Sequence, residues 1–226
     1  MGRIFYVSSM HGDDTNSGQT SEDAFRSLRK INQLEIQPGD QIFLERGSVF
    51  IGEYLHLYAG GTKEAPVVVD AYGEGALPRI EADGNGIWYQ NYGGHLDNVV
   101  HTWKGYLSSA VLLYDAEYIS IRNLEITNNP CIKNERLNQA DRMNRTGVSV
   151  IAQNHGTLHQ IELDHLYIHD VEGNIYDKHL NNGGIYMSVS RPDDEEKTGI
   201  ARYDGIHIHH CKVENCRRWG IAAGYT

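Results

Sequence analysis

The chain has 226 residues, with 20 Lys and Arg against 30 Asp and Glu, and its formal net charge is −10 at pH 7. No apolar run approaches the roughly 18 residues that a membrane-spanning helix needs, and the acidic balance disfavours a nucleic-acid partner, whose phosphates attract Lys and Arg. We therefore expect neither a membrane nor a nucleic acid as partner. The start of the chain shows no secretory signal, which leaves the localisation unknown.

The numbers of glycines and cysteines narrow the class of protein further. The chain holds 24 Gly and only 5 Pro, which predicts many tight turns without disorder. Its three cysteines, Cys131, Cys211 and Cys216, are too few and too far apart for a disulfide framework or a four-cysteine zinc site. We expect packed thiols.

Along the chain, residues 20–32 predict one short helix, because Phe25, Leu28 and Ile31 recur at three-residue spacing. After this segment, apolar and polar residues alternate over short stretches, as is typical of strands. The clearest early examples are residues 41–45, 67–71, 110–113 and 118–121.

An internal repeat organises the second half of the sequence. Residues 119–126, 161–168 and 206–213 share one template of apolar positions. Each copy contains two strands of period two, separated by a two-residue break that shifts the inward phase, as a sharp corner requires. The breaks lack the Gly-containing pairs of hairpin turns, so we do not expect the two strands to pair with each other.

A third strand accompanies each repeat, at residues 110–113, 147–150, 184–187 and 220–223, and the last three begin with glycine. Three short strands per coil predict an all-β fold, a right-handed parallel β-helix with a short N-terminal capping helix. The core columns that we expect include Val111, Val148, Ile185 and Ile221 in one and Ile119, Ile161 and Ile206 in another. We expect the corner residues Asn123, His165 and His210 to stack as a polar ladder that bonds to the turn backbone.

The same pattern suggests a domain organisation. Residues 1–66 form an N-terminal cap with the first strands, and residues 67–226 form the coils. Long segments precede the glycine-led strands, so we expect these strands to form the floor of a walled groove. Because the last coil has no polar cap, we expect exposed apolar side chains there and further coils beyond this sequence.

The N-terminal region carries a family resemblance. Residues 4–9, 12–18, 24–28, 37–42 and 47–50, followed by 71–78 and 119–128, resemble the N-terminal portion of bacterial right-handed parallel β-helix carbohydrate-active proteins of the pectate-lyase-like fold, mostly glycoside hydrolases. The resemblance implies a glycosidase that cleaves a plant or host polysaccharide or oligosaccharide. It implies a carbohydrate as partner and no cofactor. The matching residues include no catalytic pair of the family, part of which we expect in further coils.

Glycoside hydrolysis needs two carboxyl groups, about 5 Å apart for retention or about 6.5 to 9.5 Å apart for inversion. Residues 169–179 are the segment richest in suitable groups, and we expect Asp170, Glu172 and Asp177 to be the catalytic acids. The expected substrate-binding residues are His169, Lys178, His179, Tyr186, Arg218 and Trp219. The alternative interpretation of this segment is a solvated turn in which Asp170 caps a strand end.

Other readings of the sequence are weaker. His207, His209 and His210 suggest zinc, but residues two apart on a strand lie about 7 Å apart, so we expect no metal. Two alternative functions stay open: a polysaccharide lyase acting on uronate-containing glycans, and a non-catalytic glycan-binding solenoid. The acidic charge favours a hydrolase over a lyase, because uronate polymers are polyanions.

Overall fold

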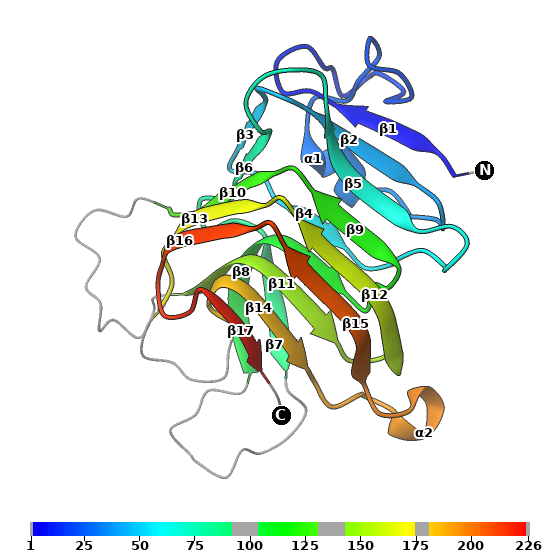
Figure 1. The fold of residues 1–226 in the computed structure, drawn as a ribbon, viewed down its shortest axis with the longest axis vertical. Coiled ribbons are helices and arrows are strands. Elements are labelled where there is room, and N and C mark those ends of the chain that lie inside the picture. Colours follow the sequence, from blue (N-terminus) through cyan, green and yellow to red (C-terminus); the bar gives the residue numbers. More distant parts are fainter. Residues whose placement is uncertain (1, 92–103, 131–142, 175–180, 225–226) are drawn as a thin grey trace.

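The computed structural model describes residues 2–91, 104–130, 143–174 and 181–224. Over these residues the chain is nearly all β, with three parallel sheets and two short helices (Figure 1). Sheet A contains β1 (Ile4–Val7), β2 (Gln41–Glu45), β5 (Val67–Tyr72), β9 (Ile119–Arg122), β12 (Thr157–Asp164) and β15 (Arg202–His209). Sheet B contains β3 (Val49–Ile51), β6 (Arg79–Glu81), β10 (Glu125–Asn128), β13 (Tyr167–Val171) and β16 (Lys212–Cys216). Sheet C contains β4 (Leu55–Leu57), β8 (Lys104–Tyr114), β11 (Asn144–Ala152), β14 (Gly183–Val189) and β17 (Ile221–Gly224).

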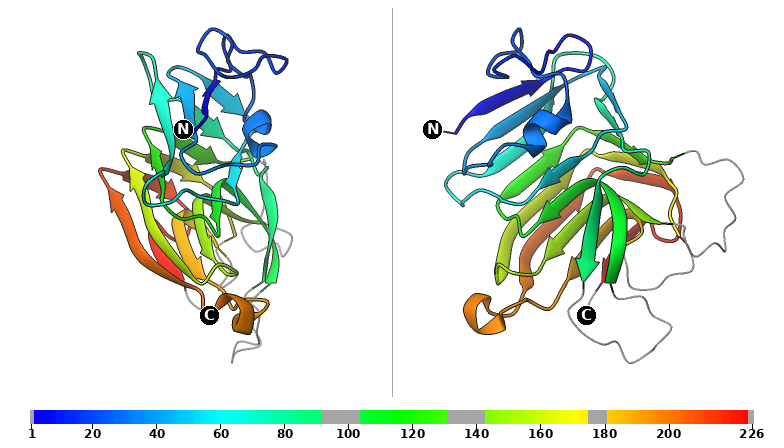
Figure 2. Two further views of the ribbon diagram at one scale, coloured as in Figure 1. Left: turned by 90° about the vertical axis from the view of Figure 1, so that its right-hand side faces the viewer. Right: turned by 180° about the vertical axis from the view of Figure 1, so that it is seen from behind.

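The chain visits the three sheets in a fixed order. From β2 onwards, each pass runs from sheet A to sheet B and then to sheet C, and each new strand pairs in parallel with its counterpart from the previous pass. The passes progress from the N-terminal elements at the top of Figure 1 to β15, β16 and β17 below, and Figure 2 shows the same progression from two other sides. The predicted all-β class with parallel sheets is confirmed.

The expected core columns are confirmed by the strand register. Val148 pairs with Val111 on one side and with Ile185 on the other, and Ile185 pairs with Ile221. In sheet A, Ile161 pairs with both Ile119 and Ile206. The alternation within 161–168 is also confirmed, since the four apolar positions are buried while Glu162 and Tyr167 are half-buried. The period-two pattern thus directs one face of every sheet into a common apolar interior.

Each of the last three corners between sheets A and B turns on one residue in the left-handed region. Asn123, His165 and His210 have φ angles of 54°, 50° and 52°. Asn and His adopt this region more readily than most residues, because the conformation crowds Cβ against the following carbonyl. The strands on the two sides of each corner belong to different sheets, so the predicted absence of a hairpin is confirmed. The expected side-chain bonds to turn backbone are wrong, because both histidines contact the carboxylate of Asp164 and Asn123 Nδ2 donates to Asp70 Oδ1 at 2.7 Å.

The glycines that lead the strands of sheet C face the interior rather than a groove. A Cβ on Gly147 would lie 2.5 Å from Ile168 Cγ2, and one on Gly184 would lie 2.4 Å from Val213 Cγ1. Val148, the residue after Gly147, also belongs to the core cluster. Two consecutive residues therefore face inward, and the first has no room for a side chain.

The predicted helix is shorter than expected. Instead of residues 20–32, α1 spans only Leu28–Asn32. Side-chain carboxylates hold the preceding segment in turns, since Asp14 Oδ1 accepts from the backbone N–H groups of Arg26 and Ser27. Glu53 Oε2 then accepts from the Leu28 N–H at 2.6 Å, which satisfies a helix-start donor from a distant part of the chain.

Two elements depart from the repeat. The strand β7 (Ile87–Asn91) pairs with β8 in antiparallel orientation and places Trp88 against Leu107, Leu112 and Ile151 on the outer face of sheet C. The short helix α2 (Glu195–Thr198) lies within the charged segment between β14 and β15 and begins where Asp194 accepts from the Lys197 N–H. No helix among the described residues is long and apolar enough to cross a membrane.

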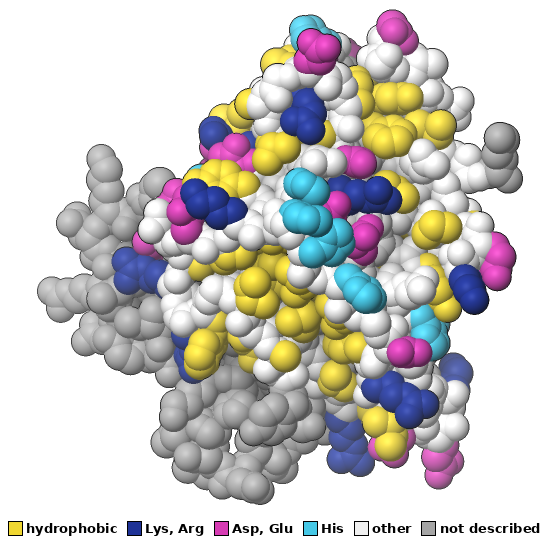
Figure 3. Space-filling model, viewed as in Figure 1, with side chains coloured by type: hydrophobic (Ala, Val, Ile, Leu, Met, Phe, Trp, Pro, Cys, Tyr) yellow, Lys and Arg dark blue, Asp and Glu magenta, His cyan; other side chains and the backbone are white. Residues whose placement is uncertain are grey.

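The strands of the last pass leave apolar side chains open, as expected. Ile221 is 51% exposed, and Ile206 and Ile208 are half-buried. Figure 3 shows hydrophobic side chains gathered over this end of the three sheets. Cys211, expected in the core, is half-buried for the same reason, and burial raises the pKa of its thiol. Cys216 is also half-buried against the core, while Cys131 lies outside the described residues.

The inward orientation of the glycines gives a matched test. Gly147→Ala should lower the free energy of unfolding by about 1 to 3 kcal/mol, because the added methyl overpacks the interior. Gly220→Ala, at the equivalent position before β17, should leave stability unchanged or slightly higher, because a Cβ there meets no atom within 4 Å. Denaturant unfolding of both variants measures the difference. Equal destabilisation of the two would show that Gly147 does not face a filled core.

Candidate active site

The predicted site residues fall where the chain passes from sheet B to sheet C. At this edge the strands β10, β13 and β16 end and the strands β11, β14 and β17 begin. Asp170, His169 and Glu172 lie at the end of β13, and Arg218 and Trp219 precede β17. Asp177, Lys178 and His179 lie outside the described residues.

Two backbone hydrogen bonds and one ion pair hold Glu172 in place. Its backbone N–H donates to the Asn128 carbonyl at 3.1 Å, and its own carbonyl accepts from Arg145 Nη1 at 2.8 Å. Its carboxylate Oε2 lies 2.6 Å from Arg217 Nε, which comes from the next pass of the chain. This arrangement fixes a carboxylate between the connections that follow β13 and β16.

Asp170 has a different environment. Its backbone is left-handed, with a φ of 50°, and the equivalent Asn215 in the next pass has a φ of 52°. Its carboxylate lies 2.7 Å from His169 Nδ1, and Nε2 of the same ring lies 3.0 Å from Glu125 Oε1. Asp and Asn tolerate this backbone region, so Asp170 has a structural reason to be there. The carboxylates of Asp170 and Glu172 thus contact different basic side chains.

His169 is stacked on Tyr167, with ring centroids 4.2 Å apart, and lies between two carboxylates. Desolvation alone would lower the pKa of His169, but the hydrogen bonds to Asp170 and Glu125 outweigh it and raise the pKa above its ordinary value. The two carboxylates therefore favour the protonated ring, in which both nitrogens donate.

Three buried hydroxyls form a cluster on the outer face of sheet C that the sequence did not reveal. Ser109 Oγ lies 2.9 Å from Ser149 Oγ, and Thr146 Oγ1 lies within 2.8 Å of both. Trp88 Nε1 donates to Ser109 Oγ at 2.8 Å, so β7 covers the cluster. Nearby, His56 Nε2 lies 2.9 Å from the Ser109 carbonyl, and burial lowers the pKa of His56 to about 4, which keeps the ring neutral.

Three buried amide side chains, which we call the amide cluster, lie at the edge of sheet C where β11 and β14 begin and the antiparallel β7 ends. They belong to Gln90 of β7, Asn144 of β11 and Asn181, which precedes β14. The Asn181 N–H donates to Gln90 Oε1 at 3.3 Å. Within the described residues, Gln90 Nε2 and both polar atoms of Asn144 and Asn181 have no hydrogen-bond partner. An unsatisfied buried polar group costs about 1 to 3 kcal/mol, so any further polar group that reached these atoms would stabilise this edge of sheet C.

The predicted aromatic contacts differ from each other in exposure. Tyr186 is buried at 7% exposure, so its ring offers no open stacking face. Trp219 is 44% exposed, and the Arg218 guanidinium lies 5.5 Å from its ring centroid. The Trp219 carbonyl accepts from the Gly184 N–H at 3.0 Å, which ties this turn to β14.

The chain is similar over its whole length to known glycoside hydrolases. The crystal structure of the GH136 lacto-N-biosidase from Eubacterium ramulus matches 99% of this chain with 55% identity and a TM-score of 0.95 in its selenomethionine form. The native form of that protein matches with 53% identity and a TM-score of 0.94. A lacto-N-biosidase of Bifidobacterium longum subsp. longum is 38% identical over 257 residues that include all of this chain. No protein-family model matches the chain.

The matches cover only part of each relative. The chain spans 36% of the Eubacterium ramulus protein and 16% of the Bifidobacterium longum protein. The chain therefore corresponds to one region of each of these relatives.

The carboxylates around His169 predict its titration. The ring should titrate above the ordinary value of about 6.5, and Glu125→Gln should move its pKa back towards that value. Because the folded pKa is raised, the stabilisation is complete below the ordinary pKa and is lost as the pH rises through the folded pKa. NMR titration of the His169 Hε1 resonance measures the shift, with Asp193→Asn in the exposed loop as control. A pKa that is the same in the wild type and Glu125→Gln would contradict the assignment.

Proposed function

We propose that the chain is part of a glycoside hydrolase that acts on oligosaccharides, with lacto-N-biosidase activity. The observation that carries the proposal is the 55% identity and TM-score of 0.95 to a GH136 lacto-N-biosidase over 99% of the chain.

We propose further that the three sheets are the faces of a right-handed parallel β-helix, with residues 1–66 as its cap and residues 67–226 as its coils. The repeated order of sheets A, B and C and the parallel pairing between successive passes support this architecture. In such a solenoid the connections between sheets B and C project on one side, and function is usually found on the side that carries the loops.

The site that we propose lies at these connections. Glu172 is favoured as a catalytic carboxylate because the Arg217 ion pair gives it one fixed orientation. Asp170 and Asp177 are proposed as the further acids. The proposed substrate-binding residues are His169, Lys178, His179, Arg218 and Trp219, and Tyr186 is left out because its buried ring offers no open face.

The chemistry requires one carboxylic acid that donates a proton to the glycosidic oxygen as the bond breaks. A second carboxylate either attacks the sugar carbon, with water later releasing the glycosyl group, or removes a proton from the water that attacks. Glu172 suits the second role, because its Oε2 is ion-paired with the Arg217 guanidinium. A positive partner favours the ionised carboxylate that this role requires.

The activity can be tested with 4-nitrophenyl lacto-N-bioside. The protein that carries this chain should release 4-nitrophenol and lacto-N-biose, and Glu172→Gln should lower kcat by about 10² to 10⁴. Asp170→Asn and Asp177→Asn are measured alongside. Glu162→Gln serves as the matched control, because Glu162 is also ion-paired but lies on sheet A.

The outcomes separate the parts of the proposal. Hydrolysis that persists in all three acid variants would place the catalytic pair elsewhere in the protein and reduce segment 169–179 to a structural role. If the wild-type protein does not cleave 4-nitrophenyl lacto-N-bioside, the proposed activity is wrong. Formation of an unsaturated uronide from a uronate glycan would favour the lyase alternative.

A further inference from the structure

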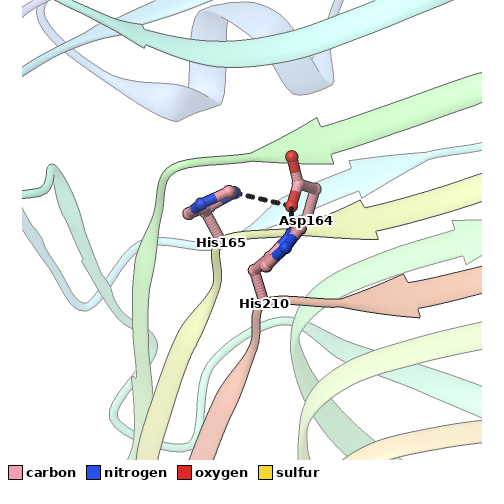
Figure 4. A group of neighbouring side chains, drawn as sticks. All are labelled: Asp164, His165 and His210. Atoms are coloured by element: carbon pink, nitrogen blue, oxygen red, sulfur yellow. Dashed lines mark hydrogen bonds and ion pairs between the residues drawn. The ribbon is translucent and has the colours of Figure 1, made fainter.

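Four side chains from two successive passes of the chain converge at one corner between sheets A and B. His165 Nδ1 lies 2.6 Å from Asp164 Oδ1, and His210 Nδ1 lies 3.1 Å from the same oxygen (Figure 4). His209 Nδ1 also lies 3.0 Å from Asp164 Oδ1 and 2.9 Å from His210 Nδ1. Three imidazole nitrogens thus face one carboxylate oxygen. Figure 3 shows histidine side chains gathered on this face of the molecule.

The strand register explains why the sequence did not reveal this cluster. Asp164 pairs with His209 across neighbouring strands of sheet A, and the corner residues that follow, His165 and His210, stack with ring centroids 4.6 Å apart. Histidines along β15 are separated by the strand rise, as expected from the sequence. Ligands can instead meet across the strands, where the spacing is shorter.

The contacts of His209 suit a ring that carries its proton on Nε2. Its Nε2 lies 3.2 Å from Glu162 Oε1, and a hydrogen bond to a carboxylate requires a proton on that nitrogen. In the neutral ring, Nδ1 then presents a lone pair to the carboxylate oxygen of Asp164. A cation between these atoms turns that repulsion into attraction. Metal-binding histidines commonly have a carboxylate on their other nitrogen, as Glu162 provides here.

The geometry suits a metal ion. Zinc bonds to nitrogen and oxygen are about 2.0 to 2.2 Å long, so a tetrahedral ion keeps its ligand atoms about 3.4 Å apart. The ligand atoms of Asp164, His165 and His210 all lie within 4.8 Å of one another. Both histidines are more than half exposed, which leaves room for small rotations.

We propose that Asp164, His165, His209 and His210 form a binding site for a divalent transition-metal ion, with Zn²⁺ as the expected ion. Imidazole nitrogens with one carboxylate select this class of metal over Ca²⁺ or Mg²⁺, which prefer oxygen ligands. The ion joins the pass that contains β12 and β13 to the pass that contains β15 and β16. It therefore stabilises the strands at the end of sheets A and B. The site is independent of the proposed hydrolase chemistry.

Zinc binding to the untagged chain tests the proposal directly. Competition with a chromophoric chelator at pH 7.5 should show one equivalent of tightly bound Zn²⁺. His165→Ala and His210→Ala should each weaken binding at least about tenfold, because loss of an outer-shell partner alone typically costs 10- to 100-fold. His207→Ala is the matched control, since His207 is an exposed histidine of β15 that lies outside the cluster. Circular dichroism verifies that each variant is folded.

A structural readout accompanies the affinities. Zn²⁺ should slow amide hydrogen exchange in β15 and β16 of the wild-type chain, and should have no such effect in the His165→Ala/His210→Ala double variant. Equal affinity of the wild type and the double variant would overturn the site. Equal weakening by His207→Ala, or bound zinc without added protection in β15 and β16, would also overturn it.

Discussion

Parallel pairing of each strand with its counterpart in the next pass is the constraint on which the rest of the structure depends. Ile161 must pair with both Ile119 and Ile206, which are 42 and 45 residues away in the sequence. Once the backbone hydrogen bonds fix this register, residues at the same point of successive passes lie close together whatever their chemistry. Apolar residues then form the common interior, and polar residues form ladders on the outside.

The register also determines where the backbone has no freedom. Gly147 and Gly184 repeat at one inward position because the core side chains of sheet B leave no space for a Cβ. Asn123, His165 and His210 repeat at one corner because the chain needs a left-handed residue there. The same repetition brings Arg217 to Glu172 and His210 to His165, so both the proposed active site and the proposed metal site are built from contacts between passes.

The sequence was informative wherever the repeat was regular. The apolar template was sufficient to predict the strands of the last three passes, their corners and the inward columns, because a period-two pattern fixes the face of every residue. Elements without a repeat were missed, including the antiparallel β7 and the helix α2. The start of α1 was misplaced because Asp14 and Glu53 bind its first N–H groups, and their partners cannot be inferred from helical spacing.

For the candidate site, residue type indicates Glu172 but not its ion-pair partner Arg217. Tyr186 was expected in an open groove, but its side chain is buried. The amide cluster carried no signal in the sequence, since Gln90, Asn144 and Asn181 are unremarkable in composition and acquire meaning only through burial without partners. Spacing along one strand does not reveal the proposed metal site, because its ligands meet across two strands.

The most direct test of the central claim is a crystal structure of the protein that carries this chain, determined with lacto-N-biose bound. The disaccharide is expected where the chain passes from sheet B to sheet C, with its hydroxyls within hydrogen-bond distance of Glu172. A disaccharide bound instead on the outer face of sheet A, in the hollow lined by Tyr118, Glu162 and His207, would contradict it.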